Sequence, residues 1–392
     1  MNEIFAKRMD NVPRSFIREI LKVIDDPEII SFAGGLPNKE LFPVVEIEKA
    51  AMYQFENFGK EILQYSTTEG YLPLREYIVD RYNKKKGLNI SAENVLITHA
   101  SQQALDLVGK IFLNTDDYLA IEEPGYLGAI QALSVYSKNF VPIKLNENGL
   151  DLEELKSALE NFSPKILYIV PNFQNPSGIS YSNEVRKEIS KLVKDYNCYI
   201  IEDDPYGELR YVGEEGLSFG HIIPERTILL GSFSKIVAPG FRLGWIIAPK
   251  NVMDKLVIAK QAADLHSNYV GQRIIYQYLK ENNLDEHISN LKKSYNSQRE
   301  AMINSIEKYF PKEVTYTKPE GGMFLWVTLP NGKSSLSLLD KAIEKKVAFV
   351  PGDPFYVNKK DVNTLRLNYT CSDEKTIEEG IKRLSICLKE II

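Results

Sequence analysis

The sequence predicts an α/β fold in which helices flank a mostly parallel central sheet, followed by a small α+β unit. Short runs rich in Ile, Leu, Val and Tyr recur through the middle of the chain, as in fully buried strands. Stretches with helical periodicity separate most of these runs, which favours parallel strands with helices on both faces. After Pro249 the pattern becomes mainly helical until about Phe310, and short strands then return.

The central sheet is predicted from six apolar runs and the helical stretches between them. The predicted strands are Val95–Thr98, Tyr118–Glu122, Ile166–Val170, Tyr199–Glu202, Thr227–Leu230 and Trp245–Ala248. The predicted helices are Ser101–Phe112, Gly125–Tyr136, Leu152–Asn161 and Asn183–Tyr196. Only a short loop with Gly and Pro joins the last two strands, so this pair can be antiparallel.

The C-terminal unit is predicted to be small and mixed. Its strands are expected near Val314–Tyr316, Met323–Thr328, Ala348–Val350 and Thr364–Asn368, before a closing helix from Asp373. The first 50 residues contain a helical stretch, Ser15–Ile24, and then an extended Gly-Gly-Leu-Pro segment. We therefore expect three parts: a segment 1–50 that packs on the small domain and the mouth of the active site, a large domain 51–285 and a small domain 286–392.

Composition narrows the class of protein. A chain of 392 residues is long enough for two or three cores, and its net charge of −5 argues against nucleic-acid binding. The spacing of Cys198, Cys371 and Cys387 does not fit a metal site, and the three residues are expected to be reduced thiols. The start of the chain does not resemble a signal peptide, and no apolar run reaches the length of a membrane span. A cytoplasmic protein that acts on small molecules is expected.

Ligands of open α/β sheets bind at the carboxyl ends of the strands, and polar residues follow the first three predicted strands there. Ser101 and Gln102 open a helix whose N–H groups suit a phosphate, although Ser101 can also be a plain helix cap. Tyr126 can stack on a planar ring or simply pack. Asn175, in an Asn-Pro turn, can bind a phenolic oxygen and a carboxylate, or only shape the turn.

Three consecutive acids follow the fourth strand, just ahead of Tyr206. Glu202, Asp203 and Asp204 come directly after buried residues, where carboxylates need partners. A carboxylate that faces a pyridine nitrogen keeps that nitrogen protonated and makes the ring a better electron sink. A divalent-metal site is the alternative, but none of the four His adjoins this run.

The fifth loop contains a lysine between two buried strands. Burial and a neighbouring cation lower the pKa of a lysine, which gives Lys235 the free amine that imine chemistry needs. Arg242 offers a fork of donors to a phosphate, and Ser232 and Ser234 add hydroxyls. A salt-bridged loop lysine is the alternative. Together, the five loops supply every part of a pyridoxal 5′-phosphate site.

These loops lie within longer motifs that carry a family resemblance. The motifs are SFAGGLPN (Ser31–Asn38), LQYSTTEGYLPLRE (Leu63–Glu76), THASQQALDLVGK, PNFQNPSG, EDDPYGELRY, GSFSKIVAPGFRLGW, GGMFLWVTLP (Gly321–Pro330) and VAFVPGDPFY with NTLRLNYT (Val347–Thr370). With them the chain resembles the fold-type I, class I/II pyridoxal-phosphate aminotransferases over essentially its whole length. It looks most like the branch that contains 2-aminoadipate, kynurenine and aromatic aminotransferases.

The resemblance implies a role for each candidate residue. Lys235 would bond to the cofactor and move the α-proton, while Asp203 would pair with the pyridine nitrogen. The remaining implied cofactor contacts are Tyr206 and Asn175 on the phenolic oxygen, Tyr126 on the ring, and Ser101, Gln102, Ser232, Ser234 and Arg242 on the phosphate, with Tyr65 from a second subunit. Arg366 and Asn175 would bind the substrate carboxylate, and Gly35 would also contact the substrate. An obligate homodimer with shared active sites is implied. Ala100 departs from the family, whose members often have Gly there; the extra methyl is expected to be tolerated.

Substrate choice is predicted to depend on Arg18. In the branch that the chain resembles, an N-terminal arginine faces the substrate side chain and can pair with a distal carboxylate; Arg18 fits that position, and its neighbour Arg14 is the other candidate. A surface arginine is the alternative. If Arg18 moves with its segment, one site can alternate glutamate and 2-oxoglutarate with aromatic, leucine-like or 2-aminoadipate partners, in a ping-pong reaction.

Two other functions fit parts of the same pattern. One is another reaction of the same cofactor, such as β-elimination or decarboxylation, because fold alone does not fix the reaction. The other is a transcription regulator, in which a winged-helix domain precedes an aminotransferase-like unit. Against the regulator, the Ser31–Gly35 motif begins close to the N-terminus of this chain, and the net charge is negative.

Overall fold

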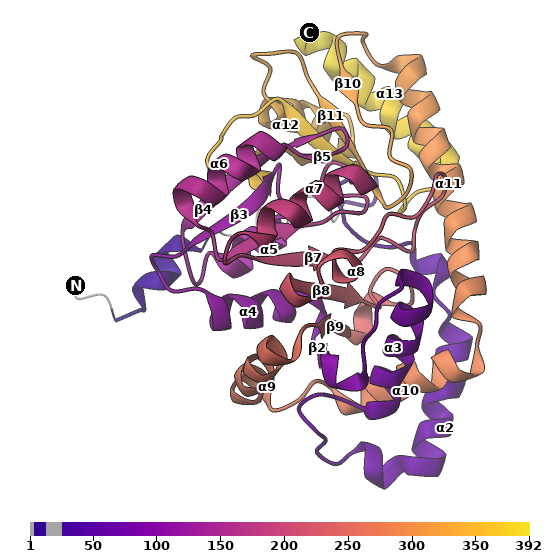
Figure 1. Ribbon diagram of the computed structural model, residues 1–392. Helices are drawn as coiled ribbons and strands as arrows, with labels where there is room; N and C mark the ends of the chain where they lie inside the picture. The colour runs from indigo at the N-terminus through magenta and orange to yellow at the C-terminus, as the bar shows by residue number, and fades with distance from the viewer. Residues whose placement is uncertain (1–3, 13–25) are drawn as a thin grey trace.

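An eight-stranded mixed sheet forms the centre of the larger part of the computed structural model, which describes residues 4–12 and 26–392 (Figure 1). The strands, in spatial order, are β2 (Val95–Thr98), β9 (Gly244–Ile247), β8 (Thr227–Ser232), β7 (Tyr199–Asp203), β6 (Ile166–Ile169), β3 (Tyr118–Glu123), β4 (Asn139–Asn146) and β5 (Gly149–Leu150). From β8 to β4 each strand is parallel to the next. The predicted α/β class is therefore confirmed.

All six predicted strands are present, and β9 is antiparallel to both β2 and β8. The short connection before β9 made that orientation predictable. Strand β4 was not predicted, because Pro142 interrupts its apolar run. Pro142 pairs with Ile121 of β3 and lies outside the short pairing of β4 with β5. The missing N–H of Pro142 therefore removes no hydrogen bond between β4 and β5.

Helices cover both faces of this sheet because consecutive strand residues point to opposite sides. In β6, Ile166 and Tyr168 belong to one apolar core, while Leu167 and Ile169 belong to another. The helices around the sheet are α2 (Val44–Ile62), α3 (Leu72–Lys86), α4 (Ala100–Phe112), α5 (Leu127–Leu133), α6 (Leu152–Phe162), α7 (Asn183–Lys194), α8 (Phe219–Ile222), α9 (Lys250–Asp264) and α10 (Tyr269–Glu281). No helix in the described ranges is both long and apolar enough to cross a bilayer.

A smaller antiparallel sheet lies beside the larger one. Its order is β10 (Thr315–Tyr316), β11 (Phe324–Thr328), β14 (Thr364–Asn368) and β13 (Val350–Pro351). Helices α12 (Ser335–Glu344) and α13 (Glu374–Ile391) pack with it in a third apolar core. Short 3-10 turns complete the chain at Lys7–Asn11, Lys39–Leu41, Ala92–Asn94, Pro224–Arg226, Pro239–Phe241 and Asp353–Phe355.

The N-terminal segment joins this smaller unit through β1 (Ile30–Ser31), which pairs in parallel with β12 (Val347–Ala348). Phe32 and Ala33 enter the same core. Helix α11 (Leu284–Tyr309) runs along both units: its first half packs in the core of the large sheet and its second half in that of the small one. The division at 50 and 285 remains a prediction, and the expected helix Ser15–Ile24 lies outside the described residues.

Candidate active site

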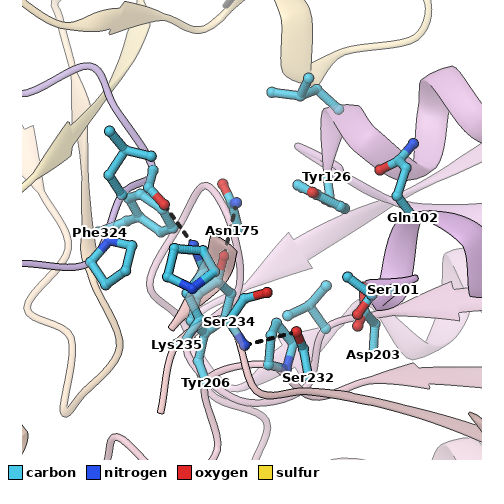
Figure 2. A pocket seen from close by; sticks show the side chains of 18 of the residues that line it. Ser101, Gln102, Tyr126, Asn175, Asp203, Tyr206, Ser232, Ser234, Lys235 and Phe324 are labelled. Carbon is cyan, nitrogen blue, oxygen red and sulfur yellow. Dashed lines mark hydrogen bonds between the residues drawn. The ribbon is translucent and has the colours of Figure 1, made fainter. Parts of the chain in front are cut away.

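A cavity of about 290 Å³ lies at the carboxyl ends of the central strands, next to the smaller unit. All five predicted loops reach it, and Figure 2 shows their side chains turned toward one another. Twelve of the fourteen residues predicted for the site line it: Gly35, Ser101, Gln102, Tyr126, Asn175, Asp203, Tyr206, Ser232, Ser234, Lys235, Arg242 and Arg366. The predicted residues therefore gather where the topological rule for open sheets places a ligand.

Lys235 follows β8 and points into the cavity. Its Nζ donates a hydrogen bond of 2.6 Å to the carbonyl oxygen of Gly35, in the segment that precedes α2. Removal from water, followed by the positive charges of Arg366 and Arg242, lowers the pKa of Lys235 to about 8. A substantial fraction of this amine is therefore neutral near physiological pH and able to act as a nucleophile or a base.

The three consecutive acids at the end of β7 turn to different partners. Glu202 Oε2 accepts from the Ser218 hydroxyl at 2.7 Å, and Asp204 Oδ1 accepts from Asn172 Nδ2 at 2.9 Å. Of the three, only Asp203 lines the cavity. Among the described residues, no group of three or more His, Cys, Asp or Glu side chains is arranged to hold a metal ion.

Asp203 is 2% exposed, and burial raises its pKa to about 7. Its Oδ2 accepts from the Tyr168 hydroxyl at 2.8 Å. Among the described residues, Asp203 Oδ1 and the buried Ser101 hydroxyl have no hydrogen-bond partner. Buried polar atoms without partners are costly, so their presence in this cavity points to a polar ligand. A protonated ring nitrogen at Asp203 fits this requirement.

Arg366, in β14, is 1% exposed and lines the same cavity. Its guanidinium carbon lies 4.2 Å from the centre of the Phe324 ring, and its Nη2 donates to the Ala33 carbonyl oxygen at 2.9 Å. Its Nη1 donates to Asn175 Oδ1 at 2.8 Å, and Asn175 Nδ2 donates to the Tyr206 hydroxyl at 3.2 Å. One hydrogen-bonded chain thus links the three residues, and it offers cationic and amide donors to a carboxylate and a phenolic oxygen.

The expected phosphate site lies where α4 begins beside β9. Ala100, at the first position of α4, has φ +57°, a conformation that favours glycine. The methyl group is accommodated there, but in the left-handed region. The Gln102 amide donates to the Gly128 carbonyl oxygen at 3.0 Å, which ties α4 to α5. The helix N-terminus, Ser101, Ser232, Ser234 and Arg242 supply N–H groups, hydroxyls and a cation around one end of the cavity.

Sequence reasoning missed several apolar walls of the cavity. Leu36, Pro37, Leu127 and Phe324 line it. Phe324 packs edge-on against Tyr206, with ring centres 5.8 Å apart. The strand that carries Phe324 was recognised, yet its apolar pattern alone does not reveal which side chain meets a cavity in another unit.

Two predicted residues do not line this cavity. Tyr65 is 78% exposed and does not reach the cavity of its own chain. Its ring lies edge-on to His266, with centres 5.9 Å apart. Arg18 lies outside the described residues.

Comparison with known proteins identifies the family. The sequence model of the family "Aminotransferase class I and II" matches residues 28–384 of this chain. Aromatic-amino-acid aminotransferase 1 of Thermococcus litoralis is 42% identical, over 98% of this chain and 94% of its own length. A Pyrococcus horikoshii kynurenine aminotransferase solved with PMP, KYN and KYA superposes with a TM-score of 0.94 at 42% identity, covering 99% and 97% of the two chains.

A third relative was solved with a cofactor adduct. It is the alpha-aminoadipate aminotransferase of Thermus thermophilus, complexed with N-(5′-phosphopyridoxyl)-L-leucine. Its TM-score is 0.92 at 40% identity, over 99% of this chain and 97% of that one. The predicted fold type, cofactor and transaminase class are confirmed. The chain belongs to the class I and II aminotransferases and uses pyridoxal 5′-phosphate as its cofactor.

Proposed function

We propose that this aminotransferase moves the amino group between L-amino acids with aromatic, leucine-like or 2-aminoadipate side chains and 2-oxoglutarate, by a ping-pong reaction in one site. One observation carries the proposal: a single cavity presents both Lys235 and the buried Arg366 to a ligand between apolar walls. The relatives named for aromatic amino acids, kynurenine and aminoadipate support this range.

We assign the cofactor contacts by position in the cavity. Asp203 would pair with the ring nitrogen, Tyr206 and Asn175 would bind the phenolic oxygen, and Tyr126 would stack on the ring. Ser101, Gln102, Ser232, Ser234 and Arg242 would hold the phosphate, at the N-terminus of α4. When bound, the cofactor supplies an aldehyde that accepts the amino group and a ring that takes up negative charge.

The protein groups then orient the amino acid and move its proton. Arg366 and Asn175 bind the α-carboxylate, and the carbonyl oxygen of Gly35 holds the Lys235 amine nearby. With its lowered pKa, Lys235 can take the proton from the α-carbon and return it to the cofactor side. In the second half of the reaction, the 2-oxo acid that accepts the amino group uses the same groups in reverse order. One site therefore serves both halves of the reaction.

The walls of the cavity suit apolar side chains. Leu36, Leu127 and Phe324 are apolar, and the cations that line the described cavity, Lys235, Arg242 and Arg366, each have a role above. A distal carboxylate therefore needs another cation, for which we propose Arg18. Arg18→Ala should lower kcat/KM for 2-aminoadipate and glutamate at least tenfold more than for leucine, because it removes one charged pair. Equal losses for all three donors would remove this role.

A donor panel with 2-oxoglutarate as acceptor tests the proposed reaction. Initial rates at several concentrations of both substrates should give parallel double-reciprocal lines, and a donor alone should convert the bound cofactor to its amine form. Intersecting lines would contradict the ping-pong order. Release of ammonia or CO₂ without the amine form would instead favour elimination or decarboxylation.

We further propose a homodimer in which Tyr65 completes the cavity of the partner subunit. The surface around α2 exposes large apolar side chains, as an unpartnered interface would: Val44, Val45, Met52, Tyr53, Phe55, Leu63, Tyr65 and Leu72. Mixing a Tyr65→Phe subunit with a Lys235→Ala subunit should place both defects in one site of each heterodimer and leave the other intact. A mixture no more active than the separate variants would contradict this sharing.

A further inference from the structure

Tyr168 lies in β6, behind the cavity, and does not line it. Its side chain is completely buried, and its hydroxyl donates to Asp203 Oδ2 at 2.8 Å. The parallel register explains this contact. Tyr168 pairs with Ile201 of β7, and Asp203 is two residues further along the same strand. Because side chains alternate between faces, Asp203 points to the same side of the sheet as Tyr168.

We propose that Tyr168 is a positioning residue for catalysis that acts through Asp203, holding its carboxylate so that Oδ1 meets the ring nitrogen of the cofactor. The inference rests on the proposed pairing of Asp203 with that nitrogen. It assigns a task to a fully buried hydroxyl that the contacts with the cofactor and substrate do not use.

The orientation of the carboxylate supports this assignment. The torsion angle about the bond to an aspartate carboxylate has a broad range, so a buried aspartate needs a partner that selects one orientation. Tyr168 occupies Oδ2 from outside the cavity, while Oδ1 has no partner among the described residues. In Figure 2, Asp203 lies beside Ser101 at the edge of the cavity. The oxygen left available is thus the one that can meet a ligand.

The charge state of Asp203 depends on the same hydrogen bond. Burial raises the pKa of Asp203 to about 7, and the hydrogen bond from Tyr168 opposes that rise. The Tyr168 hydroxyl remains protonated because burial raises its own pKa well above the usual value. Asp204, the next residue along the chain, also raises the pKa of Asp203, and Ser101 on α4 lowers it. The other titratable groups close enough to interact with the charge of Asp203 are Glu122 on β3, Tyr126 before α5 and Tyr206 after β7.

The sign of the pH effect follows. Asp203 holds a protonated ring nitrogen only when it is ionised, which requires a pH above its pKa. Loss of the Tyr168 hydroxyl raises that pKa, so the pairing weakens first near neutrality and returns at more alkaline pH.

Cofactor affinity tests the proposal without relying on turnover. The full-length enzyme is stripped of cofactor and titrated from acid to alkaline pH with pyridoxal 5′-phosphate, and with an analogue whose ring nitrogen is replaced by carbon. For Tyr168→Phe, we expect affinity for the natural cofactor to fall about tenfold at neutral pH, the loss of one hydrogen bond to a charged group. The pH midpoint should move up by about one unit, while affinity for the analogue changes less than about twofold.

Tyr181→Phe is the matched control. Tyr181 is also buried, and its hydroxyl donates at 2.6 Å to Glu122 Oε1, a carboxylate that does not line the cavity. Loss of this bond favours neutral Glu122, which makes Asp203 easier to ionise, so Tyr181→Phe should show no loss of cofactor affinity at neutral pH. Thermal unfolding of the stripped enzymes should show that both variants fold.

Three results would overturn the inference. They are equal losses for cofactor and analogue in Tyr168→Phe, the same nitrogen-dependent loss in Tyr181→Phe, and no loss in a folded Tyr168→Phe. A wild type that does not distinguish the two compounds would refute the pairing of Asp203 itself, and the role of Tyr168 with it.

Discussion

Replacement of Arg366 by lysine tests the proposed substrate site most directly. The guanidinium is buried between two rings, 4.2 Å from the centre of Phe324 and 5.2 Å from that of Phe355. It donates to Asn175 Oδ1 and to the Ala33 carbonyl oxygen from two different nitrogens. Lysine keeps the charge, but its single ammonium cannot reproduce a planar fork held between two rings.

The size of the effect follows from the contacts that are lost. A fork that binds a carboxylate makes two charge-assisted hydrogen bonds, each worth about 1.5–3 kcal/mol. Loss of most of that energy, about 3–5 kcal/mol, lowers kcat/KM by roughly 10²–10⁴-fold, because each 1.4 kcal/mol corresponds to a factor of about ten. Cofactor affinity should change little, since the phosphate and ring-nitrogen contacts lie elsewhere in the cavity.

The assay compares an amino acid with the amine that lacks its carboxylate, using conversion of the bound cofactor in single turnovers. Arg366→Lys should slow the amino acid strongly and leave the slow reaction of the amine nearly unchanged. Arg299→Lys is a control, because Arg299 is also buried but donates to the Pro319 carbonyl oxygen outside the cavity. A loss smaller than about tenfold, or an equal loss for the amine, would refute carboxylate binding by Arg366.

Two further predictions concern the cofactor end of the site. A methyl group on Gly244 would lie 2.7 Å from the Gly231 carbonyl oxygen and 2.8 Å from Ala100 Cα, both backbone atoms. Gly244→Ala should therefore cost about 1–3 kcal/mol of unfolding free energy in urea titrations and weaken cofactor binding. In Gly240→Ala nothing lies within 4 Å of the new methyl, so that variant should resemble the wild type; similar losses in both would refute the steric argument. For Lys235, whose pKa is lowered to about 8, the rate of cofactor uptake should rise with pH and level off above about pH 9, as the neutral amine predominates. A rise that continues toward 10.5, the ordinary lysine value, would contradict the lowered pKa, and Lys235→Ala should lack the visible absorption of the linked cofactor.

Most of the fold followed from local patterns. The runs at β2, β3, β6, β7 and β8 are short and apolar. A short run that is apolar on both faces is typical of a strand in a sheet that helices cover on both sides. The missed strand β4 shows the limit of this reasoning. Its proline is typical of a strand breaker, yet Pro142 lies within the pairing of β4 with β3 and outside the short pairing with β5.

The sequence by itself determined which loops meet around the cavity, because parallel strands place their carboxyl ends along one edge of a sheet. It could assign chemistry to Lys235, Asp203 and Arg242, since each follows a strand that periodicity reveals. Only the tertiary structure decided that Phe324 meets Tyr206 and that the Tyr168 hydroxyl reaches Asp203. Such contacts depend on strand register and on how the two sheets pack, and these are set by distant residues whose pairing no local pattern encodes.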